Sequence, residues 1–238
     1  MLLQACLNGA RRPDAHPRVP TTPATLAGDA VAVVAEGAGA LHVHVRGPDG
    51  LESYVPEAVA ATLDALRGAV DVPIGVSTGA WVVPDPDARL SLVGAWPVVP
   101  DFASVNFSEP GAAVLARLLL DRGVGIEAGL WHADAARVLV ESGLADECVR
   151  VLCEPIDQDL AVAEATLADL CAVLEDAAVG APRLLHGFGE TTWPMLRRAA
   201  DLGYASRIGL EDTLTLPDGS SAPDNAALVA VGRAILDG

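Results

Sequence analysis

The sequence predicts a single-domain α/β protein, a (β/α)8 barrel that spans residues 1–238. Short apolar strand patterns alternate with longer helical patterns along the whole chain. The alternation repeats eight times with no Pro-, Gly- or Ser-rich linker to mark a domain boundary. Polar residues also end nearly every predicted strand, as in barrels whose chemistry lies at the carboxyl ends of the strands. A doubly wound open sheet is the alternative, but eight units without a break in spacing fit a closed barrel better.

Eight segments are predicted to be short strands because they are apolar and lie between turn-forming residues. In chain order they are residues 2–8, 40–46, 72–77, 102–107, 124–130, 148–154, 182–187 and 205–211. Eight such units in a chain of 238 residues match the usual size of a single α/β barrel.

A helical pattern follows each strand. The expected helices are residues 23–37, 56–69, 86–95, 111–122, 133–143, 159–177, 191–202 and 223–236. Pro23 lies in a first helical turn after Thr22, and Pro223 or Asp224 opens the last helix. Glycines stand where four of these helices should end: Gly37, Gly123, Gly143 and Gly203.

The composition limits the location and the partners of the protein. Hydrophobic residues make up 51% of the chain and charged residues 20%, which allows a sizeable core. No apolar run approaches the roughly 18 residues that span a bilayer, and Met1–Cys6 lacks the features of a signal peptide. We therefore expect a cytoplasmic protein with no membrane partner. The formal net charge of −17 argues against nucleic acid as a partner.

The chain has 15 arginines and no lysine. The absence of lysine excludes a Schiff base with a carbonyl substrate, lysine-linked pyridoxal phosphate and a P-loop. An enzyme that makes or breaks a C–C bond beside a carbonyl must then stabilise an enolate in another way. A metal ion is the obvious candidate.

His42 and His44 lie in the second predicted strand, within the run Ala40–Gly47. Because side chains alternate along a strand, both imidazoles lie on one face, opposite a buried apolar face. Two neutral imidazoles that converge from one face are a common partial ligand set for a divalent metal. The alternative is a pair of hydrogen-bonded histidines that line a polar cavity.

The other strand ends carry groups that bind ligands or transfer protons. They are Asn8, Ser77, Thr78, Ser104, Asn106, Glu127, Glu154, His186, Arg207, Glu211 and Asp212. A purely structural barrel would not need such a set, so we expect a functional site at this end of the barrel.

Glu211 is the natural third ligand. In a closed barrel the second and eighth strands flank the first and lie about 10 Å apart, so their inward side chains can meet over it. His42, His44 and Glu211 would then form a site with an open coordination position. Arg207 precedes Glu211 by four residues, so a contact with Glu211 or Asp212 would keep a carboxylate ionised as a base. The alternative is an ion pair that only closes the barrel.

Two motifs are specific when taken together: the strand His42-Val43-His44-Val45-Arg46-Gly47 and the run Arg207-Ile208-Gly209-Leu210-Glu211-Asp212. Asn8-Gly9-Ala10, His16-Pro17, Ser77-Thr78-Gly79 and Ser104-Val105-Asn106-Phe107 accompany them. With these segments the chain resembles the β-keto acid cleavage enzymes, whose prototype is 3-keto-5-aminohexanoate cleavage enzyme. The resemblance runs from residue 3 to about residue 232.

The resemblance implies a (β/α)8 barrel with zinc or another divalent metal on the two histidines and Glu211. It also implies a Claisen-type exchange in which a β-keto acid and acetyl-CoA give acetoacetate and a new acyl-CoA. Asp212 would be the base, oriented by Arg207. A small-molecule β-keto acid and a CoA ester are thus the implied partners, and the family precedent suggests a homo-oligomer.

The resemblance also assigns residues to the substrate. Ser77 with Thr78, and Ser104 or Asn106, would hold the keto acid end. After the fifth strand many members have an acidic residue followed by Phe-Asp and Gly-His, whereas this chain has Glu127 followed by Ala-Gly-Leu-Trp. Glu127 would contact the variable end of the substrate.

CoA is polyanionic, so its site needs local positive charge. The loop after the first strand contains Arg11, Arg12 and Arg18, which are CoA contacts or ordinary surface residues. His186 is either a substrate contact or a buried hydrogen-bonded histidine, and the loop Trp81–Asp87 is either a lid or only a turn.

Two other functions fit the same residues. One is a mononuclear metal-dependent barrel hydrolase or an aldolase that uses no CoA. The other is a non-catalytic barrel that binds a metal or a ligand. Retention of Arg207 and Asp212 beside the metal ligands argues against the second function, because a binding protein needs no base there.

Overall fold

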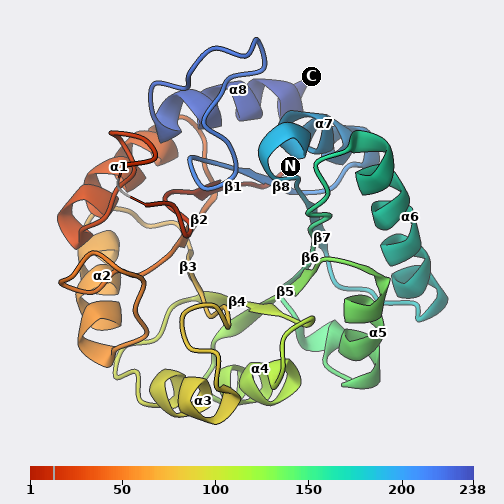
Figure 1. The fold of residues 1–238 in the computed structure, drawn as a ribbon, viewed down its shortest axis with the longest axis horizontal. Coiled ribbons are helices and arrows are strands. Elements are labelled where there is room, and N and C mark those ends of the chain that lie inside the picture. The colour runs from red at the N-terminus through yellow and green to blue at the C-terminus, as the bar shows by residue number, and fades with distance from the viewer. Residues whose placement is uncertain (13) are drawn as a thin grey trace.

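The computed structural model describes residues 1–12 and 14–238. Within them, eight strands form one sheet in the order β7-β6-β5-β4-β3-β2-β1-β8, and the pairs are parallel. Backbone hydrogen bonds join the two outer strands of this order, with Leu185 N–H donating to the Ala205 carbonyl and Ala205 N–H donating to the Arg183 carbonyl. Figure 1 shows the strands around a central axis with the helices outside them. The predicted single-domain (β/α)8 barrel is confirmed.

The strands are shorter than the predicted segments. They are β1 (Leu3–Cys6), β2 (Ala40–Val43), β3 (Ile74–Ser77), β4 (Phe102–Asn106), β5 (Gly125–Leu130), β6 (Arg150–Cys153), β7 (Arg183–Leu185) and β8 (Ser206–Ile208). The prediction of residues 205–211 as one strand is wrong at its end. The chain leaves the sheet after Ile208 and turns, with Asp212 and Thr213 N–H groups donating to the carbonyl of Gly209.

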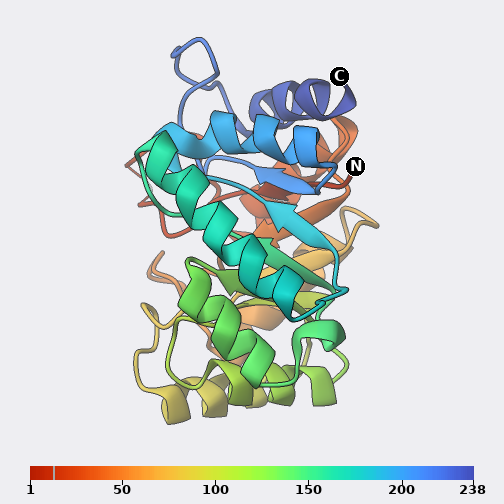
Figure 2. The ribbon, with the colours of Figure 1, turned by 90° about the vertical axis from the view of Figure 1, so that its right-hand side faces the viewer.

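The helices cover the outside of the barrel, as the side view in Figure 2 also shows. They are α1 (Pro23–Ala35), α2 (Pro56–Arg67), α3 (Pro86–Gly94), α4 (Ala112–Asp121), α5 (Ala133–Glu141), α6 (Leu160–Asp176), α7 (Thr192–Leu202) and α8 (Asn225–Asp237). Short 3-10 helices lie at Ala145–Glu147 and Gly189–Thr191. The predicted starts of the first and last helices are confirmed, because Thr22 precedes α1 and accepts from Thr25 N–H, and Asp224 precedes α8 and accepts from Ala227 N–H.

Strand β1 and the turn after β8 approach closely. A Cβ atom on Gly209 would lie 1.9 Å from the carbonyl oxygen of Cys6, so a side chain there would force the two segments apart. The Asn225 side chain fixes the same contact, since it accepts from Leu210 N–H at 2.6 Å and donates to the Leu7 carbonyl at 2.7 Å. These contacts hold the end of β1 against the turn that carries Glu211.

Among the described residues, no helix combines the length and the apolar character that crossing a membrane requires.

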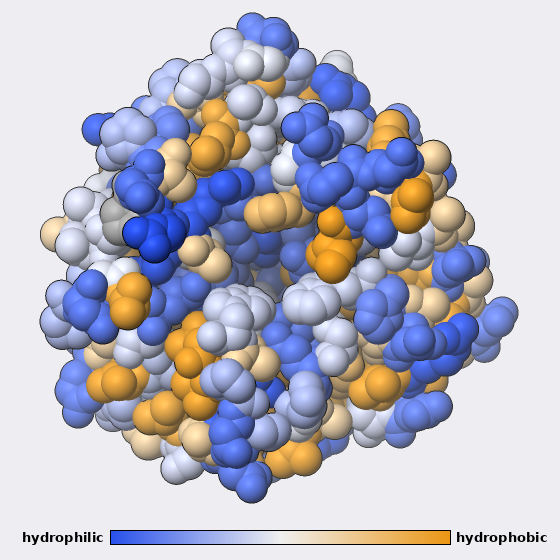
Figure 3. Space-filling view, viewed as in Figure 1, coloured by the Kyte–Doolittle hydropathy of each residue, from blue (hydrophilic) through white to orange (hydrophobic). Residues whose placement is uncertain are grey.

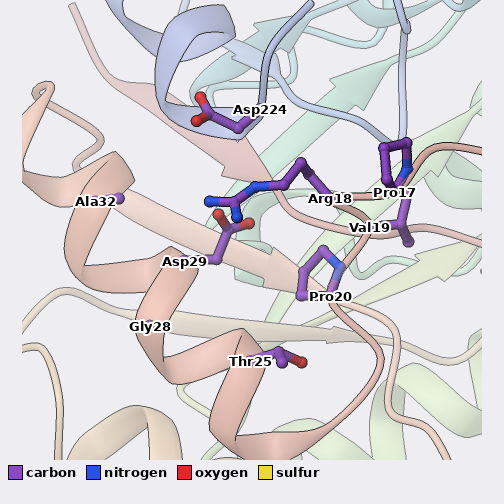
Figure 4. Close-up of a pocket in the computed structure, with 9 residues that line it drawn as sticks. All are labelled: Pro17, Arg18, Val19, Pro20, Thr25, Gly28, Asp29, Ala32 and Asp224. Carbon is purple, nitrogen blue, oxygen red and sulfur yellow. The ribbon is translucent and has the colours of Figure 1, made fainter.

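A groove of about 400 Å³ lies outside the barrel, between α1, the start of α8 and the loop after β1 (Figure 4). Arg18 extends across this groove toward Asp29. The Asp29 carboxylate accepts from the Asn225 side chain at 2.6 Å. Burial nonetheless raises the pKa of Asp29 to about 6, because the Asn225 hydrogen bond and the charge of Arg18 offset only part of the desolvation.

We predict that Asp29→Asn stabilises the protein at neutral pH and not at acidic pH. The folded pKa lies above the ordinary value of 3.8, so ionisation of Asp29 lowers the free energy of unfolding as the pH rises through about 4 to 6. Urea unfolding at pH 7.5 should show a gain of about 1–3 kcal/mol for the variant. At pH 4 the gain should vanish. The control is Asp71→Asn at an exposed acid, which makes the same chemical change on the surface and should alter the free energy of unfolding little. A gain for Asp29→Asn that does not vary with pH would contradict the account.

Candidate active site

The three predicted metal ligands converge at the carboxyl end of the barrel. His42 belongs to β2, His44 follows this strand directly, and Glu211 lies in the turn after β8. The Nε2 atoms of His42 and His44 lie 3.8 and 3.6 Å from the two carboxylate oxygens of Glu211. One ligand atom of each residue falls within 4.8 Å of the other two. Strand order explains this convergence, because β2 and β8 both pair with β1.

Contacts at Nδ1 orient both imidazoles. The Nδ1 atom of His44 lies 2.6 Å from Glu52 Oε2, and that of His42 lies 3.3 Å from the hydroxyl of Ser104. Each ring therefore directs its Nε2 atom toward Glu211. The Asn8 side chain also fixes the backbone of His44, since it donates to the carbonyl and accepts from the N–H, both at 2.9 Å.

The donor set fits a divalent metal. Glu211 Oε2 is buried and has no hydrogen-bond partner among residues 1–12 and 14–238. Two imidazole nitrogens and one carboxylate that face a shared point form a set typical of zinc sites with an open position. The carboxylate of Glu52 at Nδ1 of His44 is a partner that orients histidine ligands in known metal sites.

Gly9 makes room for Glu211. Its φ of +56° lies in the left-handed region, which glycine adopts without strain. A Cβ atom on Gly9 would lie 2.4 Å from Cγ of Glu211. The Asn8-Gly9 pair thus positions both sides of the ligand set.

Electrostatics separate the two histidines. Burial lowers the pKa of His42 to about 4, although Glu211 acts against it. Burial also opposes the charge on His44, but the carboxylates of Glu211 and Glu52 outweigh it and raise its pKa to about 9. For Glu211, burial is likewise outweighed, because Arg207 and the histidines hold its pKa well below the usual range.

Arg207 pairs with both acidic residues of the turn. Its guanidinium donates to Glu211 Oε1 at 2.7 Å and to Asp212 Oδ1 at 2.7 and 3.2 Å. We expected this contact to keep a carboxylate ionised, and the lowered pKa of Glu211 agrees with that expectation. The pKa of Asp212 moves the other way and is raised, because complete burial outweighs the charge of Arg207. Asp212 Oδ2 is buried and, within the described part of the chain, has no hydrogen-bond partner.

His186 lies between two carboxylates. Its Nδ1 atom is 3.6 Å from Asp212 Oδ1, and its Nε2 atom is 3.4 Å from Glu154 Oε1. His186 is fully buried, and Glu154 lines the cavity in front of it. Burial would raise the pKa of Glu154, but His186 outweighs burial and lowers it. The structure thus places Glu154, named only as a strand end in the sequence, at the wall of the site.

A cavity of about 60 Å³ lies in front of the three predicted metal ligands. Its lining includes the predicted substrate residues Ser77, Ser104 and Asn106. Thr78 lies behind this lining, because its hydroxyl donates to the backbone carbonyl of Ser104 at 2.7 Å.

The predicted position of Glu127 at a strand end needs correction. Strand β5 continues three residues beyond Glu127, to Leu130, so Glu127 lies one layer deeper in the barrel. Its side chain is fully buried and contacts Ser104 and Arg150. This position does not offer the expected contact with the variable end of a substrate.

A wider mouth of about 560 Å³ opens above the cavity. Figure 3 shows the molecule hollowed at the centre of this face. Aromatic and charged side chains line the mouth, among them Trp81, Trp131, Phe188, Arg11, Arg12 and Glu154. The guanidinium of Arg11 lies 5.6 Å from the centre of the Phe188 ring. Arg18 lines the groove between α1 and α8 instead (Figure 4).

Sequence reasoning missed Glu52 and the role of Trp81. The Trp81 ring stacks on His44, with 5.9 Å between ring centres, and its indole N–H donates to Glu52 at 3.1 Å. The turn signal Pro48-Asp49-Gly50 could have pointed to Glu52. This turn reverses the chain, so that the backbone of Glu52 forms an antiparallel β-bridge with Arg46. Arg46 lies two residues after His44, and Glu52 is thereby brought beside this histidine.

The pattern of the family described as BKACE, beta-keto acid cleavage enzyme, matches residues 1–238. The chain belongs to this family. A 3-keto-5-aminohexanoate cleavage enzyme from Fusobacterium nucleatum subsp. nucleatum is 26% identical over 249 residues, with 96% of this chain and 88% of the relative covered.

One of two similar solved structures supports the fold. An N-acetylmannosamine-6-phosphate 2-epimerase from Clostridium perfringens superposes with a TM-score of 0.57 at 15% identity, covering 89% of this chain and 87% of the epimerase. A mandelate racemase/muconate lactonizing enzyme from Roseiflexus sp. gives a TM-score of 0.48 at 16% identity, covering 79% of this chain and 48% of that enzyme. The first of these likenesses supports the barrel and carries nothing further at this identity.

We predict that Arg207→Met strongly destabilises this β-keto acid cleavage enzyme. The substitution leaves the buried carboxylates of Glu211 and Asp212 close together without their shared cation. Breaking a buried pair in this way costs about 3–5 kcal/mol, which urea unfolding measures. Arg117→Met is the matched control, since it removes a solvent-exposed pair with Glu147 and should leave the unfolding midpoint almost unchanged. Equal midpoints for the wild type and Arg207→Met would show that Arg207 does not hold the turn together.

Proposed function

We propose that this protein is a metal-dependent β-keto acid cleavage enzyme that uses acetyl-CoA as co-substrate. The products would be acetoacetate and a new acyl-CoA. The observation that carries this proposal is the convergence of His42, His44 and Glu211 in a buried cavity of a barrel from this family. The name of the Fusobacterium relative, a 3-keto acid cleavage enzyme, supports the substrate class.

His42 Nε2, His44 Nε2 and the Glu211 carboxylate would hold the cation, and zinc suits this nitrogen and oxygen donor set. When bound, a divalent cation polarises the β-carbonyl and stabilises enolate charge. The lysine-free chain has no iminium route to the same end.

Asp212 is the proposed base. Arg207, which lines the cavity, holds the Oδ1 atom of Asp212, and the Oδ2 atom, buried outside the cavity lining, would take a proton from the carbon between the two carbonyl groups of the substrate. The raised pKa of Asp212 favours proton uptake, since a base works best when its pKa approaches the working pH. Ser77 and Asn106 line the cavity opposite and would bind the carboxylate end of the substrate.

The proposed exchange conserves every atom and charge. The carbon that loses its proton to Asp212 forms a bond to the thioester carbonyl of acetyl-CoA. The released CoA thiolate then attacks the original β-carbonyl, the old C–C bond breaks, and acetoacetate takes back the proton. Arg11 and Arg12 line the mouth and supply positive charge for the polyanionic CoA.

Metal content tests the ligand set. After equilibration with zinc and desalting, elemental analysis should find about one zinc per wild-type chain, as expected for a single three-ligand site. His44→Ala and Glu211→Ala should each lose it. His132→Ala, which removes a histidine that caps α5, should retain it. A wild type that takes up no zinc would refute the metal-dependent proposal.

Activity tests the base. With acetyl-CoA and a series of β-keto acids, the wild type should form acetoacetate and acyl-CoA in equal amounts. Asp212→Asn should lower kcat by about 100- to 10,000-fold, because the amide cannot accept the proton. Asp218→Asn, at an exposed loop position, is the control. Turnover that needs no acetyl-CoA would instead identify a hydrolase or an aldolase on the same site.

A further inference from the structure

A chain of buried polar side chains lies beneath His42. Ser104 and Glu127 are register partners on β4 and β5, so their side chains point into the same layer of the barrel. The Ser104 hydroxyl lies 2.6 Å from Glu127 Oε2 and 3.3 Å from Nδ1 of His42. The guanidinium of Arg150 lies 3.0 Å from the other oxygen, Glu127 Oε1. Nothing in the proposed reaction uses Glu127 directly.

The direction of each hydrogen bond follows from the groups involved. Glu127 faces the Arg150 guanidinium, which has only donors, so the Glu127 carboxylate is the acceptor of this chain. The Ser104 hydroxyl has one hydrogen and donates it to Glu127. Its oxygen must therefore accept from His42, which places the ring proton on Nδ1. The lone pair is then on Nε2, the atom that faces Glu211.

The second histidine is held in a related way. Glu52 accepts directly from Nδ1 of His44, at 2.6 Å. Each imidazole is thus linked to a glutamate by hydrogen bonds from its Nδ1 atom, His44 directly and His42 through Ser104. Carboxylates at this position are known to fix the tautomer and orientation of histidine ligands.

We propose that Glu127 is a positioning residue that acts through Ser104 to fix the tautomer of His42. The inference rests on the proposed metal-dependent function, and it replaces the expected substrate contact of Glu127. In Glu127→Gln, the guanidinium that lies 3.0 Å from Oε1 favours the amide oxygen on its side, so the NH2 group faces Ser104 and Gln4. The Gln4 side chain, which donates to Oε2 at 3.4 Å, can reverse its amide to accept from this NH2 group, because its own oxygen has no partner among the described residues. The serine hydroxyl then donates to His42 Nδ1, and the ring proton moves to Nε2, where it blocks the ligand position.

The test is the protonation of His42 in zinc-free protein at pH 7.5, read from long-range ¹H–¹⁵N correlation of ¹⁵N-histidine protein. The signals are assigned by their loss in His42→Ala. The wild type should show a protonated Nδ1 and an unprotonated Nε2, and Glu127→Gln should show the reverse. Ser206→Ala removes another buried serine hydroxyl, which donates to the Leu185 carbonyl, and should leave the pattern unchanged. The same His42 tautomer in the wild type and Glu127→Gln would overturn the inference.

Zinc affinity provides a second readout, measured by competition with a chromophoric chelator. Glu127→Gln and Ser104→Ala should bind zinc about 10- to 100-fold more weakly than the wild type. Ser104→Thr, which keeps the hydroxyl, should restore the affinity. Ser104→Ala leaves the pair between Glu127 and Arg150 intact, so it serves where Glu127→Gln folds poorly.

The two proposals fail in different ways. A wild type that binds zinc no more tightly than Glu127→Gln and Ser104→Ala overturns the positioning role alone. A wild type that binds no zinc, while the His42 tautomer still reverses in Glu127→Gln, refutes the metal-dependent function. It would leave Glu127 as the residue that sets the His42 tautomer.

Discussion

The site depends on the close contact between β1 and the turn that follows β8. Gly209 allows this turn to lie against the Cys6 carbonyl, and Asn225 ties the two segments together with hydrogen bonds to both. The contact carries Glu211 over β1 toward the histidines of β2. Packing of the turn against β1 and assembly of the predicted ligand set therefore have one physical cause.

Arg207 gives the two neighbouring carboxylates different properties. Glu211 also faces two histidines, so opposite charge dominates and its pKa falls well below the usual range. Asp212 is fully buried, so desolvation dominates and its pKa rises. Two acids whose pKa values are moved in opposite directions are suited to different roles, one as a permanently ionised ligand and the other as a proton acceptor.

The sequence predicted the features that depend on local pattern and on strand order. The barrel, the helix caps and the convergence of His42 with Glu211 follow from periodicity and from the closure of eight parallel strands. Glu127 was placed at a strand end because the apolar pattern does not show how far β5 continues beyond it.

The partners of the histidines and the pKa of Asp212 were beyond sequence reasoning. Glu52 and Trp81 reach His44 from loops, where hydrophobic periodicity gives no information about contacts. The pKa of Asp212 is the balance of two large opposing effects, burial and Arg207, and a motif reveals only the second. Glu127 and Asp212 are both fully buried, and the sequence pattern does not show how deep a side chain lies. Depth removes Glu127 from the cavity lining and raises the pKa of Asp212.

Anomalous diffraction from crystals of the zinc-loaded protein, collected on both sides of the zinc edge, tests the central claim most directly. The account predicts one strong peak about 2.0–2.2 Å from His42 Nε2, His44 Nε2 and an oxygen of Glu211. A peak held by other residues, or no peak between β2 and the turn after β8, would contradict it.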